Sequence, residues 1–291
     1  MAAGVSNTTA STDWGKADFE AIYNCPDPRR YFTTLQPLDY QIPHHGQAVF
    51  RAVTEALQRR RSDRPPLSVI DLCCSYGVNA ALLNHRLSLT DLYSRYTGLA
   101  TRTPATAQLA QEDRTFFATR RRPEAARVIG LDSAEAAVEY AESAGLLDRG
   151  FSENLELVDP SEEFRQSLAG IDLITVTGGV GYISERTYAR LLDCMSSPPW
   201  VASFVLRTVP YEQISALLAR AGLVTEKLTT RTFRQRRFAD GDERRATFAA
   251  LAARGLSTVG KEADGFYHAE LYLSRPAADA AALPLAELLP G

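Results

Sequence analysis

The chain has 291 residues and a net charge of −3, with 45% hydrophobic and 23% charged residues. This length accommodates one large domain or two small ones, and the composition is that of an ordinary globular protein. The charge balance excludes an overall attraction to nucleic acid or to an anionic membrane surface. No apolar run approaches the about 20 residues that cross a bilayer, so we expect no membrane contact and a cytoplasmic location.

The beginning of the chain is small and polar over residues 1–16, which predicts disorder there. Residues 17–62 differ, because they combine aromatic residues and prolines with an amphipathic helical pattern over 47–60. So many aromatic side chains in an irregular segment should pack onto another surface. We therefore expect residues 17–62 to form a lid over the mouth of a cavity.

From residue 67 onward, short apolar runs alternate with helical patterns. This alternation predicts an α/β fold, namely a doubly wound, mainly parallel seven-stranded sheet with an antiparallel edge strand and helical insertions. The expected strands cover residues 67–72, 128–131, 155–158, 171–176, 202–206, 223–232 and 268–273. The expected helices between them cover residues 78–86, 134–145, 161–168, 184–195 and 211–221.

Two segments interrupt this alternation. Residues 87–124 have the pattern of two extra helices, and residues 233–267 include a helix from about 242 to 254. Each could cover a ligand as a lid, or could be ornament or a homodimer contact, and the sequence leaves these alternatives open. We expect a single domain over 17–275 and a peripheral tail over 276–291.

The run Val69-Ile70-Asp71-Leu72 is followed by a bend of small residues, Cys73-Cys74-Ser75-Tyr76-Gly77, before a helical pattern begins. This order predicts a buried parallel strand, a tight turn and a helix start. Ligands of open α/β sheets bind at the carboxyl ends of such strands. The bend lacks the glycines of the phosphate loop and of the dinucleotide fingerprint, which favours a ligand without a pyrophosphate.

Three later strand ends also carry polar residues or glycines. Asp132 and Ser133 follow the second strand, where a carboxylate can accept two hydrogen bonds from a ribose diol. Asp159 follows the expected third strand, where it could accept a hydrogen bond from an adenine amine. The turn Thr177-Gly178-Gly179 follows the fourth strand and permits close approach of a ligand. The four strand ends predict one crevice shaped for a nucleoside.

Over roughly residues 45–275, these motifs resemble those of the class I S-adenosylmethionine (SAM)-dependent methyltransferases. Residues 70–77 match the family's first motif, with Cys73 and Ser75 where its first two glycines would be. Residues 128–133 match the ribose-binding strand end, and residues 172–179 match the fourth-strand motif. The resemblance implies SAM as the cofactor. The residues that it assigns to cofactor binding are Asp71, Cys73, Cys74, Ser75, Tyr76, Gly77, Asp132, Ser133, Asp159, Thr177, Gly178 and Gly179.

The activity that the resemblance implies is methyl transfer to an oxygen, nitrogen or carbon of a small-molecule acceptor, with specialised metabolism as a setting. Because the cofactor supplies the electrophile, the protein mainly aligns a nucleophile and excludes water. His44, His45 and Tyr182 are candidate catalytic residues, and Tyr31, Tyr40 and Tyr182 are candidate substrate contacts. Purely structural roles stay open for all of them. No metal is expected, because the four cysteines lack ligand spacing.

Two other functions stay open on the sequence. A regulatory protein could bind SAM or S-adenosylhomocysteine (SAH) without turnover, and the two missing glycines favour this alternative. A nicotinamide-dependent oxidoreductase would need a glycine-rich turn against a pyrophosphate, an approach that residues 73–76 would obstruct. The basic clusters, including residues 234–237, are expected to be solvated surface.

Overall fold

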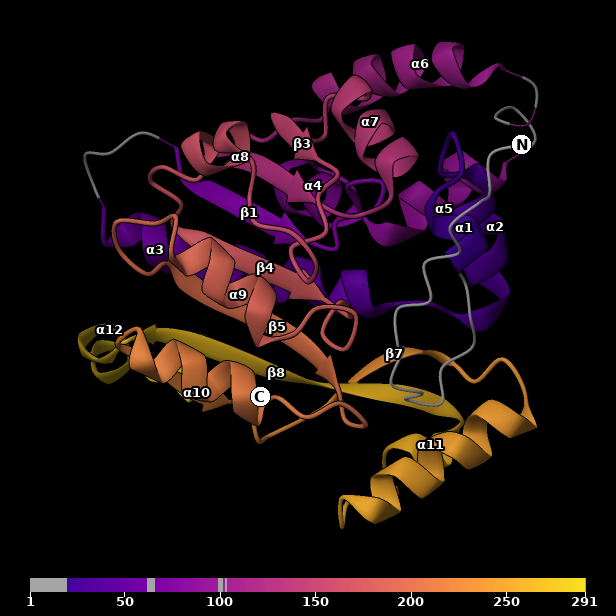
Figure 1. Cartoon of the computed structure of the whole chain (residues 1–291). Helices are drawn as coiled ribbons and strands as arrows, with labels where there is room; N and C mark the ends of the chain where they lie inside the picture. Colours follow the sequence, from indigo (N-terminus) through magenta and orange to yellow (C-terminus); the bar gives the residue numbers. More distant parts are fainter. Residues whose placement is uncertain (1–19, 62–65, 99–101, 103, 291) are drawn as a thin grey trace, which may run out of the picture.

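An eight-stranded sheet forms the centre of the molecule (Figure 1). The computed structural model describes residues 20–61, 66–98, 102 and 104–290, so the disorder expected over residues 1–16 lies outside the described residues. The strands follow the order β3-β2-β1-β4-β5-β8-β6, and β7 pairs with β8. They are β1 (Ser68–Leu72), β2 (Arg127–Leu131), β3 (Arg149–Phe151), β4 (Leu173–Thr177), β5 (Trp200–Leu206), β6 (Leu223–Lys227), β7 (Phe233–Arg237) and β8 (Phe266–Pro276).

Helices cover both faces of the sheet, because successive residues of each strand point to opposite faces. Val69 and Leu173 belong to one apolar cluster, together with residues of α3, α4 and α7. Ile70 and Ile174 belong to the other, together with residues of α8, α9 and α10. These helices are α3 (Ile42–Arg59), α4 (Val78–Asn84), α7 (Glu135–Ser143), α8 (Glu162–Ser167), α9 (Glu185–Leu192) and α10 (Glu212–Arg220). The expected doubly wound α/β class is confirmed.

Strands β1 to β5 are parallel, and β8 runs antiparallel to β5, β6 and β7. The mainly parallel sheet is therefore as expected, but it has eight strands instead of seven. The run expected over 223–232 ends earlier, as β6, and Phe233–Arg237 forms a further strand, β7. As expected, antiparallel pairing is confined to one edge of the sheet, where β8 pairs with β5, β6 and β7, and β8 itself lies next to the edge strand β6.

The prediction of a third strand over residues 155–158 is wrong. The third strand is β3, which pairs with β2 and has only three residues, too few to produce an apolar run. Residues 155–158 form turns, in which Glu156 accepts hydrogen bonds from the Ser184 N–H at 2.8 Å and the Thr187 hydroxyl at 2.7 Å. These bonds hold the loop against the start of α9.

The N-terminal segment and the insertion over 87–124 pack against each other. Phe32 stacks on Tyr96 of the insertion, with ring centroids 4.7 Å apart. Asp113, also in the insertion, accepts hydrogen bonds from Tyr96 at 2.6 Å and from Tyr140 of α7 at 2.5 Å. The segment contains α1 (Glu20–Tyr23) and α2 (Arg29–Leu35), and the insertion contains the two helices that its pattern predicted, α5 (Leu89–Thr97) and α6 (Thr106–Ala118).

The later part of the chain forms three more helices: α11 (Gly241–Ala253), α12 (Ala277–Ala282) and α13 (Leu285–Leu288). Leu285 and Leu288 are buried, and the Leu285 N–H donates to Glu226 of β6 at 2.9 Å. The tail thus packs onto the antiparallel side of the sheet. Within the described residues, no helix combines the length and apolarity needed to span a bilayer.

Candidate functional site

The carboxyl ends of β1, β2 and β4 meet at one edge of the sheet, because these strands are parallel neighbours (Figure 1). The start of α3 lies at the same edge, since a Cβ atom on Gly46 would be 3.7 Å from Thr177 Oγ1. We call this edge the strand-end site. It comprises the turns after β1 and β4, Asp132 at the end of β2, and Gly46 in the first turns of α3.

The turn after β1 has left-handed backbone at residues other than glycine. The φ angle is 55° at Cys73 and 46° at Ser75, and Gly77 follows with 71°. A left-handed conformation costs a non-glycine residue about 1–2 kcal/mol. Glycine adopts this conformation without that cost, so Cys73 and Ser75 have backbone angles that favour glycine.

Asp132 connects the end of β2 to this turn. Its Oδ2 accepts a hydrogen bond from the Ser75 N–H at 2.8 Å, and its Oδ1 accepts one from the Ala134 N–H at 3.0 Å. Burial raises the pKa of the Asp132 carboxyl, and these backbone donors oppose the shift. Each carboxylate oxygen has a second acceptor position, so the group can still receive a diol. The neighbouring Ser133 is exposed.

Asp71 is buried beneath the turn. Thr175 Oγ1 donates to its carboxylate at 2.7 Å, and Asn79 Nδ2 donates at 3.1 Å. Burial raises the pKa of Asp71 to about 7, although both hydrogen bonds favour the charged form. The side chain thus joins β1, β4 and α4, and it helps to hold the turn between β1 and α4 in place.

Side chains from two other segments close on the turn after β4. Gly178 has a φ angle of 77°, and a Cβ atom there would be 2.7 Å from Gln235 Nε2. A Cβ atom on Gly179 would be 2.6 Å from Cys73 Sγ, so the close approach requires glycine. The Cys73 thiol therefore fills space between the two turns that a glycine at position 73 would leave to a ligand.

Three buried polar atoms beside the strand-end site have no hydrogen-bond partner among the described residues: Ser75 Oγ, Thr177 Oγ1 and Gln235 Oε1. Buried polar atoms are nearly always paired, and an unpaired one indicates a place for a water or a polar ligand group. The three atoms come from the turn after β1, the end of β4 and β7. A ligand with hydroxyl or ammonium donors would satisfy them.

Tyrosines from the N-terminal segment lie beside the strand-end site. The ring centroid of Tyr31 lies 5.7 Å from that of Tyr23 and 6.2 Å from that of Tyr40. Tyr182, which is 64% exposed, and Asp132 are close enough to Tyr23 to help raise its pKa, although burial is the larger cause. Burial also raises the pKa of Tyr31, and that of Tyr40 to about 12. The buried hydroxyls therefore stay protonated at neutral pH and act as donors instead of bases.

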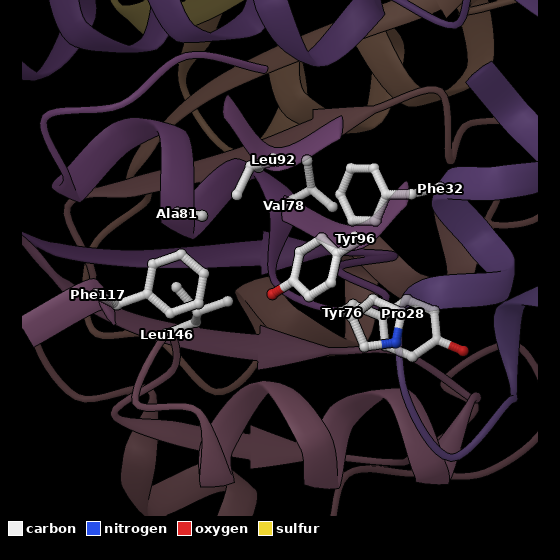
Figure 2. Close-up of a pocket in the computed structure, with 9 residues that line it drawn as sticks. All are labelled: Pro28, Phe32, Tyr76, Val78, Ala81, Leu92, Tyr96, Phe117 and Leu146. Carbon is white, nitrogen blue, oxygen red and sulfur yellow. The ribbon is translucent and has the colours of Figure 1, made fainter. Parts of the chain in front are cut away.

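Cys74 and Tyr76, two of the expected cofactor contacts, point into the core. A Cβ atom on Gly130 of β2 would be 2.7 Å from Cys74 Sγ. Tyr76 lines an apolar cavity of about 10 Å³ between the turn, the N-terminal segment and the insertion (Figure 2). That volume holds about one water molecule. The Tyr76 hydroxyl accepts a hydrogen bond from the Cys25 N–H at 2.9 Å, which fixes the N-terminal segment onto the turn.

Asp159 lies away from the strand-end site, so the expected position after the third strand is wrong. Strand β3 ends at Phe151, and the carboxylate of Asp159 pairs with Arg190 of α9 at 2.9 Å. Its side chain is 77% exposed. The residues that do follow β3 are Ser152, Glu153 and Asn154, and no pattern in the sequence singled them out.

His44 and His45 lie at the start of α3, beside the strand-end site. His44 is exposed, with its ring centroid 5.5 Å from that of His45, and the His45 ring is 5.5 Å from Phe233 of β7. The pKa of His45 is lowered to about 4, mainly by burial and in addition by the neighbouring His44 and Arg231. His45 is therefore neutral at pH 7. The next residue, Gly46, is the one that faces Thr177.

Gln235 and Arg236 of β7 are the residues of this region that the sequence did not reveal. Both are 1% exposed, whereas residues 234–237 were expected to be solvated. Arg236 donates a hydrogen bond to Glu243 of α11 at 2.8 Å. Its positive charge also opposes the rise in the pKa of Tyr40 that burial causes. Four consecutive polar residues have no apolar alternation, and nothing in the sequence identified Glu243 as the partner.

A larger cavity, of about 260 Å³, lies at the opposite edge of the sheet, among residues that include Arg61, Asp172 and Trp200. It is separate from the strand-end site, because Asp172 and Trp200 stand at the amino ends of β4 and β5. In the part of the chain that the structure describes, no group of three or more histidine, cysteine or acidic side chains could hold a metal ion.

No protein-family model matches the chain, and no curated protein matches it. Among solved structures, it is similar to magnesium protoporphyrin IX methyltransferase from Synechocystis PCC 6803 with bound SAM, at 14% identity over 80% of each chain and a TM-score of 0.37. It is also similar to the plantazolicin methyltransferase BpumL in complex with SAH, at 10% identity over 88% of this chain and 93% of that one, with a TM-score of 0.41. The [4+2]-cyclase SpnF has 13% identity over 78% of this chain and 80% of its own, with a TM-score of 0.38. At such low similarity, these structures do not determine the ligand or the reaction of this chain.

Proposed function

We propose that this protein is a SAM-dependent methyltransferase that acts on a small-molecule acceptor. The observation that carries the proposal is the hydrogen bond from the Ser75 N–H to Asp132 at 2.8 Å. It places a carboxylate suited to a ribose diol against a tight left-handed turn. That turn has no run of glycines to receive a pyrophosphate, which favours a nucleoside ligand.

The side chains at the strand-end site offer the hydrogen-bond acceptors that the ribose hydroxyls and the ammonium group of SAM require. Asp132 would hold the ribose hydroxyls, and the unpaired Ser75 Oγ, Thr177 Oγ1 and Gln235 Oε1 would accept hydrogen bonds from hydroxyl or ammonium donors. When bound, this cofactor supplies an electrophilic methyl group. The protonated Tyr40 would orient the acceptor and help to exclude water, without removing a proton from it.

We also propose that the exposed Tyr182 contacts the substrate, because it stands close to Tyr23 and Tyr40 at the open side of the site. The cytoplasm is the proposed location, since no disulfide joins any of the four cysteines, all of which lie among the described residues, as is usual in a reducing compartment. The net charge of −3 supports the absence of a nucleic-acid partner.

A second candidate is a regulatory protein that binds SAM or SAH without turnover. The contact that favours it is the Cys73 thiol against Gly179, which narrows the space between the turns after β1 and β4. Calorimetry with SAM, SAH and NAD tests the cofactor, and binding of NAD without either S-adenosyl ligand would overturn both candidates. A methyl-transfer screen over cell-extract metabolites then separates turnover from binding alone.

The substitution Asp132→Asn tests the ribose assignment. It retains one carbonyl oxygen for the turn but removes the charge, so we expect SAH binding to weaken by about 1–3 kcal/mol in calorimetry. Asp159→Asn is the matched control, because the exposed Asp159 side chain pairs with Arg190. The dissociation constant of this variant for SAH should equal that of the wild type. Equal affinity in Asp132→Asn and the wild type would contradict the ribose assignment.

A further inference from the structure

A cationic surface borders the strand-end site on the side of β7. We call it the β7 rim, and it consists of Arg231, Arg234, Arg237, His44 and His45. The three arginines are exposed. Each guanidinium lies over an aromatic ring, with Arg231 5.4 Å from the centroid of Phe233 and Arg234 4.7 Å from that of Phe266. Arg237 is 4.5 Å from the same Phe266 centroid. The rings restrain the arginine side chains and thus orient the positive charges.

Carboxylates neutralise only part of this rim. Arg234 pairs with Asp264 at 2.7 Å, and Arg237 approaches Asp39 at 3.8 Å. Arg231 has no ion pair among the described residues. Three guanidinium groups therefore face two carboxylates, and the rim keeps a positive charge even when both histidines are neutral.

The charges near His45 also indicate that the β7 rim is positive. The main charges acting on this imidazole are those of His44, Arg231, Arg234 and His268, and none of them is acidic. These groups come from α3, the loop before β7, β7 and β8. The positive charges of Arg231 and Arg234 therefore lie near His45 with no acidic group among the main charges beside them, and such a surface attracts an anion.

The β7 rim is continuous with the strand-end site through two segments. Arg234 lies on the rim, and the next residue, Gln235, reaches the turn at Gly178. His45 lies on the rim, and the next residue, Gly46, faces Thr177. One small molecule could therefore contact the rim with one end and the strand-end site with the other.

We propose that the methyl acceptor carries a carboxylate or phosphate group, which Arg231 and Arg234 bind while the nucleophile faces the strand-end site. Guanidinium groups pair with both anions through two parallel hydrogen bonds, which fixes orientation as well as affinity. The assignment of this anion to the acceptor rests on the proposed methyltransferase function. Anion binding by the rim does not, so the two can fail separately.

The first test measures anion binding without any methyl transfer. Inorganic phosphate is titrated into the protein, both alone and with added SAH, while NMR follows the imidazole signals of the four histidines: His44, His45, His85 and His268. We expect saturable shifts at His44 and His45 and none at the buried His85. In Arg231→Gln the phosphate dissociation constant should rise about tenfold or more, because a charge-assisted hydrogen bond is lost.

Arg220→Gln is the matched control, since it removes an exposed arginine at the end of α10 and should leave phosphate binding unchanged. Equal thermal midpoints of all variants show that the fold is intact. Absence of shifts at His44 and His45, or equal binding by Arg231→Gln and the wild type, would overturn the proposal.

The second test compares acceptors in pairs, each an acid and its neutral amide, in the methyl-transfer assay. We expect the acids to have at least tenfold higher kcat/KM, and Arg231→Gln to raise KM for the acids with little change in kcat. Equal turnover of acids and amides would overturn the inference and leave the methyltransferase proposal in place. Failure to bind SAM or SAH in calorimetry would instead reject the proposed function, whatever the phosphate titration shows.

Discussion

Asp71 has a buried carboxyl whose charge state matters for stability. Two donors, Thr175 and Asn79, hold it between β1, β4 and α4, yet burial raises its pKa to about 7 from an ordinary value of 3.8. Burial therefore outweighs both hydrogen bonds. Near neutral pH the native protein contains this carboxyl partly in its neutral form.

The raised pKa predicts a pH-dependent stability. As pH rises from about 4 to about 7, the unfolded chain releases a proton that the native state retains, so the free energy of unfolding falls in this window. In Asp71→Asn the side chain is neutral at every pH and this loss disappears. Relative to that of the wild type, we expect the free energy of unfolding of the variant to rise by up to about 1.4 kcal/mol per pH unit between pH 4 and pH 7.

Urea denaturation at pH 5 and pH 8 measures this difference. Asp193→Asn, at an exposed position after α9, is the control and should show the same offset from the wild type at both pH values. If the offset of Asp71→Asn is also the same at pH 5 and pH 8, Asp71 is ionised in the native protein at both.

Between elements, the contact that shapes the strand-end site is that of Cys73 in the turn after β1 with Gly179 in the turn after β4. A Cβ atom on Gly179 would be 2.6 Å from Cys73 Sγ and 2.8 Å from its Cβ. We therefore expect Gly179→Ala to lower the free energy of unfolding by about 1–3 kcal/mol, as overpacking does. Cys73→Gly removes the colliding atoms and the left-handed strain, so the double variant should recover most of the loss.

Urea denaturation of both single variants and the double variant gives the coupling energy. Gly241→Ala is the control partner for Cys73→Gly, because its Cβ would meet only the flexible end of Arg245, and the two effects should add. Additive effects of Gly179→Ala and Cys73→Gly would show that the two turns do not press on each other.

The elements that the sequence predicted well are those with local signals. Strands β1, β2 and β4 are apolar runs bounded by polar residues or glycine, and their parallel pairing follows from the helices between them. Strand β3 is only Arg149–Phe151, while the apolar residues Leu157 and Val158 nearby are exposed in a turn, so hydrophobicity indicated the wrong segment. In strand β7, Arg236 is buried together with its ion-pair partner Glu243, a burial that no periodicity reveals.

The same distinction applies to the strand-end site. Asp132 and Ser75 were identified because each follows an apolar run. The hydrogen bond between them joins residues that are far apart in the sequence, and only the fold brings them together. Asp159 was misplaced because its assignment depended on the third strand. The rim around Arg231 was missed because one of its two aromatic supports, Phe266, comes from β8, and His44 and His45 come from α3.

For the molecule as a whole, the insertion over 87–124 connects the N-terminal segment to the central domain. Asp113 is fully buried and pairs with Arg95, and it accepts hydrogen bonds from Tyr96 at 2.6 Å and Tyr140 at 2.5 Å. Tyr140 belongs to α7, which covers the sheet, and Tyr96 stacks on Phe32 of the N-terminal segment. An insertion attached in this way is part of the packed core, unlike a lid that opens freely.

Asp113→Ala tests this integration. The substitution leaves the Arg95 guanidinium and two buried hydroxyls without their acceptor, so we expect the free energy of unfolding to fall by about 3–5 kcal/mol in urea denaturation. Glu112→Ala removes the neighbouring exposed carboxylate of α6, which accepts a hydrogen bond from the exposed Gln108, and should cost less than about 0.5 kcal/mol. If both variants cost equally little, the insertion is a separable appendage. A large loss confined to Asp113→Ala means instead that the insertion and the sheet unfold together, because the acceptor lost in α6 is shared with α7.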